Sequence, residues 1–340
     1  MEQKAMIIGE ELAKKYLTPE DVIDCVEKTW RWYGEGKVVM PNKITTDLTI
    51  QGIGGWFNAM PAYIQPMDVA GIKLVGGYDA NRALGLPYIM ANLMITDSRT
   101  GVLRAVISGN WINDLRTGAQ PAIMAKLLAS STDAVTIIGT GLQGYMSLLC
   151  MSRVLPLKEV RLSDISDAAM DRFIQHFPDA GFRFVKCASN EEACRGANVI
   201  ITVTNANANL VEYDWIQKGA LVMTMGSFRE TSFDSVRKAD RIATDHVGQS
   251  LHRGNVKELA EMGEITAESF DIVIPDVLAG KQPARVNPDD YIYAQIIGTG
   301  MLDVAVGGLL LEKLKAYAGK QCEAVQKKVA RLQEVGYKEY

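Results

Sequence analysis

Residues 134–149 read AVTIIGTGLQGYMSLL, in which an apolar run meets a glycine-rich loop. The loop has the pattern GxGxxG and lies where a strand would end and a helix would begin. Gly139 permits the tight turn, Gly141 lets the backbone approach a pyrophosphate, and Gly144 lets the helix pack closely on the strand. The N–H groups at the start of the helix would face the phosphates. This stretch predicts a dinucleotide site, with loop contacts from Gly139, Thr140, Gly141, Leu142, Gln143 and Gly144.

An acidic residue after the next predicted strand bears on the choice of dinucleotide. Asp164 follows the predicted strand 159–162, at roughly the spacing expected after such a loop. A carboxylate there accepts hydrogen bonds from ribose hydroxyls and repels a 2′-phosphate. Asp164 therefore favours NAD(H) over NADP(H), the alternative being that it is a solvated turn residue.

Strand and helix patterns alternate outward from this loop. This alternation is typical of an α/β fold with a parallel, doubly wound sheet of the Rossmann type. The strand patterns cover 134–138, 159–162, 182–186, 198–203, 220–225 and 241–244, and the helix patterns cover 144–154, 168–176 and 191–195.

The flanking segments have a different texture. Residues 37–110 hold short apolar runs broken by Gly, Asn and Asp, which predicts antiparallel hairpins with a turn at 97–101. Thr18 followed by Pro19 is typical of a helix start. Residues 114–130 predict a helix that begins or kinks at Pro121. A longer helical pattern covers 299–318, and the charged tail after it favours a surface helix.

Composition and charge exclude several classes of protein. The chain has 340 residues, enough for two domains, and a net charge of −4 without a basic run, which argues against nucleic-acid or anionic-membrane partners. Its five cysteines show no CxxC spacing, so neither a zinc site nor a disulfide framework is expected. No apolar leader and no apolar run of membrane-spanning length are present, which predicts a cytoplasmic protein.

Several short sequence motifs occur in a fixed order over nearly the whole chain. With them, the sequence resembles the ornithine cyclodeaminase/mu-crystallin family, which includes archaeal-type alanine dehydrogenases and ketimine reductases. The resemblance implies a Rossmann domain at 131–298 inserted in a split α+β domain, 1–130 plus 299–340, that binds substrate and forms a homodimer. The motifs are MPAY at 60–63, GIK at 71–73, GLP at 85–87, DLRTGA at 114–119, GTGLQG at 139–144, TVT at 202–204 and GTGMLD at 298–303.

The resemblance also assigns candidate catalytic residues. Lys73 matches the lysine that contacts the substrate carboxylate, and Arg116 matches an arginine between cofactor and substrate. Asp303 matches an aspartate that neutralises these cations or receives an amine. Lys43 stands near a family arginine and could anchor a carboxylate, although a solvated lysine is the alternative. Ordinary ion pairs are the alternative for the other three.

The same comparison extends the list of expected contacts. Met60 and Phe228 join Lys43, Lys73 and Arg116 as candidate substrate contacts. The further cofactor contacts are Tyr88, Arg116, Thr202, Thr204, Met225, Gly226, Ser227 and Ile297.

Two departures from the cyclodeaminase pattern decide between activities. Phe228 stands where that branch has an acid for the substrate's distal amine, and Glu230 is a weaker match for that role. Tyr88 replaces a small hydroxyl residue and would reshape the pocket. We therefore expect an NAD(H)-dependent amino-acid dehydrogenase or imine reductase acting on a small amino, imino or oxo acid.

Two other functions remain open at this point. Ornithine cyclodeaminase activity and a mu-crystallin-like binding role are the alternatives. His252 or Arg253 could also lie near the substrate. The spacing of the histidines does not favour a metal site.

Overall fold

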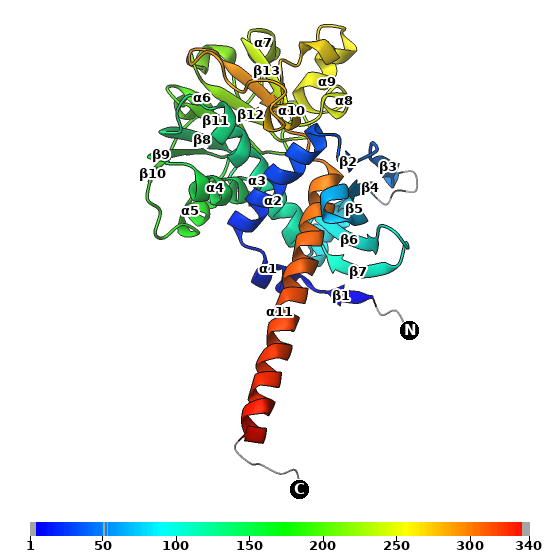
Figure 1. Cartoon of the computed structure of the whole chain (residues 1–340). Coiled ribbons are helices and arrows are strands. Elements are labelled where there is room, and N and C mark those ends of the chain that lie inside the picture. The colour runs from blue at the N-terminus through cyan, green and yellow to red at the C-terminus, as the bar shows by residue number, and fades with distance from the viewer. Residues whose placement is uncertain (1–4, 50–51, 53, 335–340) are drawn as a thin grey trace.

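The computed structural model describes residues 5–49, 52 and 54–334, with side chains described up to residue 319 (Figure 1). Within these residues the chain builds two β-sheets, one from the middle of the sequence and one from its first third. The long helix α11 (Gly300–Glu334) packs against the second sheet and projects beyond it (Figure 1).

The middle of the chain forms an eight-stranded sheet in which every pairing is parallel. The strand order is β10-β9-β8-β11-β12-β15-β13-β14, so the winding reverses between β8 and β11. This confirms the predicted doubly wound α/β sheet, and ligands of such sheets bind at that reversal. The strands are β8 (Ala134–Ile138), β9 (Glu159–Ser163), β10 (Arg183–Lys186), β11 (Val199–Thr202), β12 (Leu221–Thr224), β13 (Arg241–Thr244), β14 (Ile272–Val273) and β15 (Ile292–Gln295).

The apolar composition of the central strands follows from burial on both faces. Every residue of β11, β12 and β15 is buried, as expected where helices cover both sides of a parallel sheet. The sequence did not predict β14 and β15. β15 lies between β12 and β13, and it follows short helices and strand β14 that the sequence pattern did not indicate.

Helices and short helical turns connect these strands. Serine caps begin two of them: Ser166 accepts a hydrogen bond from the N–H of Ala169, and Ser189 accepts one from the N–H of Glu192. The helices are α4 (Leu142–Val154), α5 (Asp167–Gln175), α6 (Asn190–Cys194), α7 (Phe233–Arg237), α8 (Val247–Ser250), α9 (Gly254–Glu261) and α10 (Ile274–Leu278).

The first third of the chain forms a mixed sheet of order β1-β7-β6-β5-β4-β2, with β3 also paired to β4. The pairings from β2 to β7 are antiparallel, which confirms the predicted hairpins, whereas β1 runs parallel to β7. The strands are β1 (Met6–Ile8), β2 (Val38–Val39), β3 (Ile44–Asp47), β4 (Gly55–Ile64), β5 (Val69–Tyr78), β6 (Ile89–Asp97) and β7 (Leu103–Ser108).

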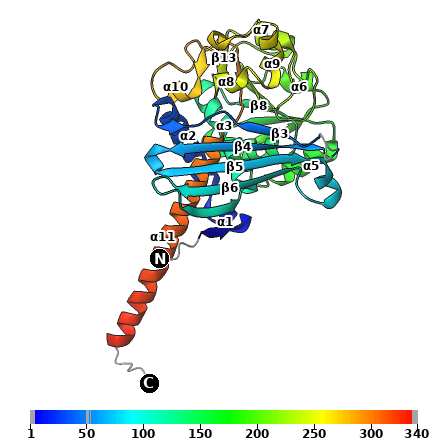
Figure 2. The same cartoon turned by 90° about the vertical axis from the view of Figure 1, so that its right-hand side faces the viewer.

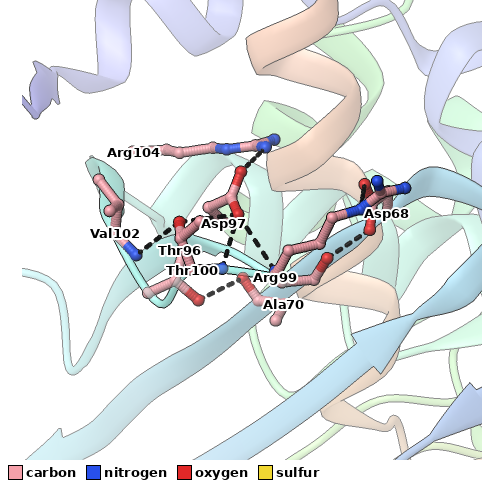
Figure 3. Close-up of polar contacts among 9 residues, drawn as sticks. Asp68, Ala70, Thr96, Asp97, Arg99, Thr100, Val102 and Arg104 are labelled. Carbon is pink, nitrogen blue, oxygen red and sulfur yellow. Dashed lines mark hydrogen bonds and ion pairs between the residues drawn. The ribbon is translucent and has the colours of Figure 1, made fainter.

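The turn between β6 and β7 is organised by one carboxylate (Figure 3). Asp97 Oδ1 accepts hydrogen bonds from the N–H groups of Arg99 and Thr100, at 3.1 and 2.9 Å. Arg104 pairs with the other oxygen, and these contacts hold the pKa of Asp97 well below its usual range. Gly101 then takes a φ of +72° that closes the predicted turn.

Three helices cover one face of the mixed sheet: α2 (Pro19–Gly34), α3 (Asn110–Leu128) and α11, with α1 (Glu10–Tyr16) beside them. Thr18 caps α2 as predicted, and Trp30 of α2 is fully buried. Figure 2 looks onto the other face, which no described segment of the chain crosses. None of the described helices combines the length and apolar character needed to cross a bilayer.

The expected domain boundaries fall in two connections between elements. The first lies between α3 and β8, and the second lies between β15 and α11. Residues from both ends of the chain thus join the mixed-sheet unit. Boundaries at 130/131 and 298/299 stay a prediction of where the two units separate.

Helix α3 joins the two units through close contact with α4. It begins at Asn110, earlier than predicted, and Pro121 lies inside it rather than at its start. A Cβ atom added at Gly118 would lie 2.3 Å from the carbonyl oxygen of Met146 in α4. The absent side chain at Gly118 therefore sets how closely these helices approach.

We expect Gly118→Ala to destabilise the protein, because backbone atoms of α4 cannot move aside as a flexible side chain would. Overpacking of this kind costs roughly 1–3 kcal/mol, which corresponds to a Tm lowered by several degrees, measured by thermal unfolding. Gly181→Ala is the matched control, since its Cβ meets nothing within 4 Å, and its Tm should hold. Equal Tm values for the two variants would contradict this packing argument.

Candidate functional site

The glycine-rich loop lies between β8 and α4, at the carboxyl end of the parallel strands. Gly139 has a φ of +101°, and a Cβ at Gly144 would lie 2.3 Å from the carbonyl oxygen of Gly139. A Cβ at Gly141 would instead meet nothing within 4 Å. Gly141 is the N-cap of α4 and provides no side-chain cap for the first N–H groups of the helix. These residues fit a pyrophosphate.

Asp164 lies beside this loop, directly after β9. Its Oδ2 accepts hydrogen bonds from the N–H and the hydroxyl of Thr140, at 2.7 and 2.8 Å, while Oδ1 accepts one from Ser166. Oδ1 accepts this one hydrogen bond and so has a second lone pair for a further donor, whereas both lone pairs of Oδ2 are used. Asp164 therefore braces the loop, and its contact with a ribose stays a prediction.

Two adjoining cavities lie where the parallel sheet meets the mixed sheet. The outer cavity has a volume of about 760 Å³ and the inner cavity about 190 Å³. Gln143 of the glycine loop lines both, so the cavities connect to the dinucleotide loop. The residues that line both are Lys43, Trp56, Asn58, Ile89, Thr117, Gln143, Met225, Ser227 and Arg253.

A buried ion triad lies at the inner cavity. Lys73 of β5 has its Nζ 2.7 Å from Oδ2 of Asp303, and Arg116 of α3 donates from Nε to Oδ1 at 3.0 Å. Asp303 belongs to the first turn of α11 and is fully buried. The structure thus brings together all three candidate catalytic residues, from three elements that are far apart in sequence.

Asn113 completes this triad, and sequence reasoning missed it. Its Oδ1 accepts hydrogen bonds from Lys73 Nζ at 3.2 Å and from Arg116 Nη2 at 2.8 Å. Asn113 precedes Arg116 by one helical turn, so the i, i+3 spacing on α3 was the available signal.

Burial and neighbouring charge change the acidity of the two lysines. Burial, and then the positive charge of Arg116, lower the pKa of Lys73 to about 8, against the opposing effect of Asp303. Burial, and then Arg253 and Lys73, lower the pKa of Lys43 to about 7. Both lysines can therefore change protonation state near neutral pH.

Arg253, which the sequence left only as a possible neighbour of the substrate, is a wall residue of both cavities. Its Nη2 donates a hydrogen bond to Ser227 Oγ at 2.5 Å. The inner cavity is thus lined by four cationic side chains, and no carboxylate is among its described wall residues. Such a wall favours an anionic ligand.

Several buried polar atoms on these walls have no hydrogen-bond partner within the described chain. Buried polar groups in native proteins are nearly always paired, so unpaired ones that share a cavity indicate a ligand. The atoms are Lys43 Nζ, Asn58 Oδ1, Gln143 Oε1 and both amide atoms of Gln120.

The remaining candidate residues lie at different depths. Met60 is opposite Lys73 in the β4–β5 pairing and lines the inner cavity, as does Ile297. Phe228 is half exposed and lines only the outer cavity, together with Tyr88. The predicted cofactor residues Thr204, Met225, Gly226 and Ser227 also line the outer cavity.

Glu230 holds the loops around the outer cavity. It is fully buried; Oε1 accepts hydrogen bonds from the N–H and hydroxyl of Thr204, and Oε2 accepts them from Thr202 and Gly226. Burial raises the pKa of Glu230 against these hydrogen bonds. Thr202 is itself fully buried, so the structure places its hydroxyl against Glu230 rather than in either cavity.

The fold and the site together define a dinucleotide-binding type of α/β protein with a buried, cation-lined pocket. The model of the ornithine cyclodeaminase/mu-crystallin family matches residues 2–317. The chain belongs to this family, which confirms the resemblance seen in the sequence.

Individual relatives cover most of the chain. Alanine dehydrogenase of Archaeoglobus fulgidus is 29% identical over 314 residues, covering 91% of this chain and 95% of that protein. Ketimine reductase mu-crystallin of Mus musculus is 29% identical over 254 residues, covering 74% and 78%. A solved archaeal alanine dehydrogenase dimer with bound NAD has a TM-score of 0.86 at 29% identity, covering 92% and 97%.

The lowered pKa of Lys43 predicts a pH-dependent affinity for anions. Below pH of about 7 the ammonium is already charged, whereas above it an anion must first draw a proton onto the amine. The affinity for succinate, measured by calorimetry, should therefore fall as pH rises above about 7, by up to about tenfold per pH unit.

Two variants test whether the pH dependence of binding comes from Lys43. Lys43→Met should weaken binding and flatten its pH dependence. Lys126→Met, which removes an exposed lysine paired with Glu27, should behave like the parent protein. An affinity that is constant or rises with pH would show that Lys43 does not meet the anion.

Proposed function

We propose that this protein is an NAD(H)-dependent amino-acid dehydrogenase or imine reductase, acting at the α-carbon of a small amino or imino acid. The observation that supports it is the inner cavity, whose wall carries four cations and connects through Gln143 to the glycine loop. A small carboxylic acid would fill such a cavity beside a bound dinucleotide. The names of the archaeal alanine dehydrogenase and the murine ketimine reductase are consistent with this chemistry.

The chain's own residues would hold and neutralise the substrate. Bound NADH supplies the hydride that reduces a C=N bond, and NAD⁺ takes it back in the reverse direction. Lys73 and Arg116 would bind the α-carboxylate, since charge-assisted hydrogen bonds offset its loss of water. Asp303 and Asn113 hold both cations in place. With a pKa of about 8, Lys73 can also exchange a proton with the substrate nitrogen near neutral pH.

Ring-forming deamination, the cyclodeaminase reaction, is the second candidate. One observation favours it: Asp79 lines the outer cavity and could receive a distal amine. Phe228 argues against it, because an aromatic ring offers an ammonium only about 0.5–2 kcal/mol and no site for a proton. We therefore rank net redox chemistry first, and both above a non-catalytic binding role.

We further propose that a second copy of the chain covers the open face of the mixed sheet. That face carries a shallow, largely apolar depression of about 400 Å³. Apolar patches of this kind on a sheet surface are typical of interfaces. The related archaeal alanine dehydrogenase was solved as a dimer. The depression is lined by Val39, Pro41, Pro61, Ala62, Tyr63, Ala70, Gly71, Ile72, Met94 and Thr96.

The proposed reaction predicts net NADH oxidation on imines. A panel of α-oxo acids with ammonia, followed by the loss of NADH absorbance, should show turnover that requires both the acid and ammonia. Ornithine with catalytic NAD should yield little proline. Proline formation without NADH oxidation on any imine would make the cyclodeaminase the correct function.

Lys73→Met, assayed on the best acid of that panel, tests the site assignment. It should lower kcat/KM by roughly 10- to 100-fold or more, because a charge-assisted bond is lost, while NADH affinity changes little. Lys28→Met is the control, since Lys28 is exposed and pairs with Asp24. Full activity of Lys73→Met would contradict the assignment of Lys73 to the substrate site.

The cofactor choice gives a separate prediction. With Asp164 in place, kcat/KM should favour NADH over NADPH by about tenfold or more, a difference of about 1.4 kcal/mol. Asp164→Asn keeps an acceptor for Thr140 and removes the charge, so it should narrow this preference. Asp167→Asn alters a neighbouring exposed acid and should leave the ratio as it is. A tenfold preference of the parent protein for NADPH would contradict the assignment.

A further inference from the structure

The four cations of the inner cavity fall into two pairs at different depths. Lys73 and Arg116 line only the inner cavity, and both contact Asp303. Lys43 and Arg253 line the inner and the outer cavity, so they lie where the two meet. One α-carboxylate held by the inner pair would leave the second pair unused.

The second pair has no carboxylate partner in the described part of the chain. Lys43 Nζ is buried without a hydrogen-bond partner, and Arg253 has the hydroxyl of Ser227 as its side-chain contact. Asp79 also lines the outer cavity, but no ion pair joins it to Lys43 or Arg253 among the described residues. Two further acids lie near the inner cavity and are engaged elsewhere. Asp245 accepts hydrogen bonds from the N–H groups of Ile297 and Gly298.

Asp114 is the other nearby acid. Its Oδ1 accepts hydrogen bonds from the side-chain amides of Asn113 and Gln143. No ion pair joins it to Lys43 or Arg253 among the described residues. Both cations are therefore left for a ligand.

The backbone of Arg253 is held in place beside both cavities. Its carbonyl oxygen accepts a hydrogen bond from Gln295 Nε2 at 2.6 Å, and the residue directly precedes α9. The guanidinium itself is held through Nη2 by Ser227, and its remaining N–H groups can donate to a carboxylate. The dinucleotide phosphates are expected at the glycine loop, of which only Gln143 reaches these cavities. The substrate is thus the remaining source of an anion.

We infer that the substrate carries a second carboxylate, which Arg253 and Lys43 bind while Lys73 and Arg116 bind the first. The inference rests on the proposed function and names its substrate class: a short dicarboxylic amino acid and its imino or oxo counterpart. The reaction is balanced as imine reduction: oxo acid and ammonia form the imine and release water. Hydride from NADH then adds to the α-carbon, and the nitrogen takes a proton from solvent. The same cations would repel the distal ammonium of a diamino acid.

The test compares acids of equal carbon number that differ in the distal group. NADH oxidation with ammonia is measured for oxaloacetate against 2-oxobutyrate, and for 2-oxoglutarate against 2-oxovalerate, each with an ammonia-free control. At least one dicarboxylate should exceed its partner in kcat/KM by roughly ten- to hundredfold. Amino-acid analysis should identify the matching dicarboxylic amino acid as product.

Variants assign the preference to a residue. Arg253→Gln should lower the dicarboxylate-to-monocarboxylate ratio by about tenfold or more, and Arg253→Lys should fall between it and the parent. Arg237→Gln is the control, because Arg237 is outside both cavities and pairs with Glu264. A preference for the monocarboxylates, or a ratio unchanged in Arg253→Gln, overturns the inference while imine reduction itself still supports the proposed function.

Binding without turnover separates the two proposals. Calorimetry of the NAD-saturated protein should show that succinate binds about tenfold or more tightly than butyrate, and that Arg253→Gln removes the difference. Equal binding of the two acids overturns the inference. If succinate is preferred but no imine is reduced, the second-carboxylate site stands and the redox function fails.

Discussion

The carboxylate of Asp303 is the contact that ties the two ends of the chain to one site. It is fully buried and lies against Lys73 from a strand of the mixed sheet and Arg116 from α3. Without this carboxylate, two buried cations would carry a large desolvation cost. The position of α11 is therefore coupled to that of β5 and α3. The contact explains why α11 packs against the mixed sheet, although the whole parallel sheet lies between the two in the sequence.

The parallel sheet supplies the second half of the site for a topological reason. Winding reverses between β8 and β11, and the loops after these strands diverge there to leave a crevice. The glycine loop follows β8, and Thr204 follows β11. Glu230 then connects Thr204 to Gly226, so one buried acid fixes two loops at the crevice. The cation-lined wall, most of which comes from the mixed-sheet unit, closes this crevice on its other side.

Local pattern predicted most of the fold, whereas the family resemblance supplied the candidate site residues Lys73, Arg116 and Asp303. Apolar runs and the glycine loop identified the parallel sheet, because strand burial and the turn at Gly139 leave strong local signals. β15 was not predicted, since its four buried residues are too few to show a period and the short helix α10 before it left no recognised pattern. The site was harder where a role depends on contacts distant in sequence. Asn113 and Arg253 look like ordinary polar residues until the fold places them beside Lys73 and Lys43.

The burial of Lys43 in the cation-rich wall lowers the stability of the folded protein. Lys43 has a pKa of about 7 in the folded chain, against 10.5 as its ordinary value. Between these values the unfolded chain binds more protons than the folded one, so this lysine's contribution to the free energy of unfolding rises with pH. Below pH of about 7 the full penalty of a buried, unpaired ammonium is present. A protein that binds no anion would gain stability from a neutral residue at this position. A ligand carboxylate offsets this penalty directly. The desolvation of Lys43 therefore lowers the stability of the protein without ligand and, for the same reason, increases the preference of the cavity for an acidic substrate.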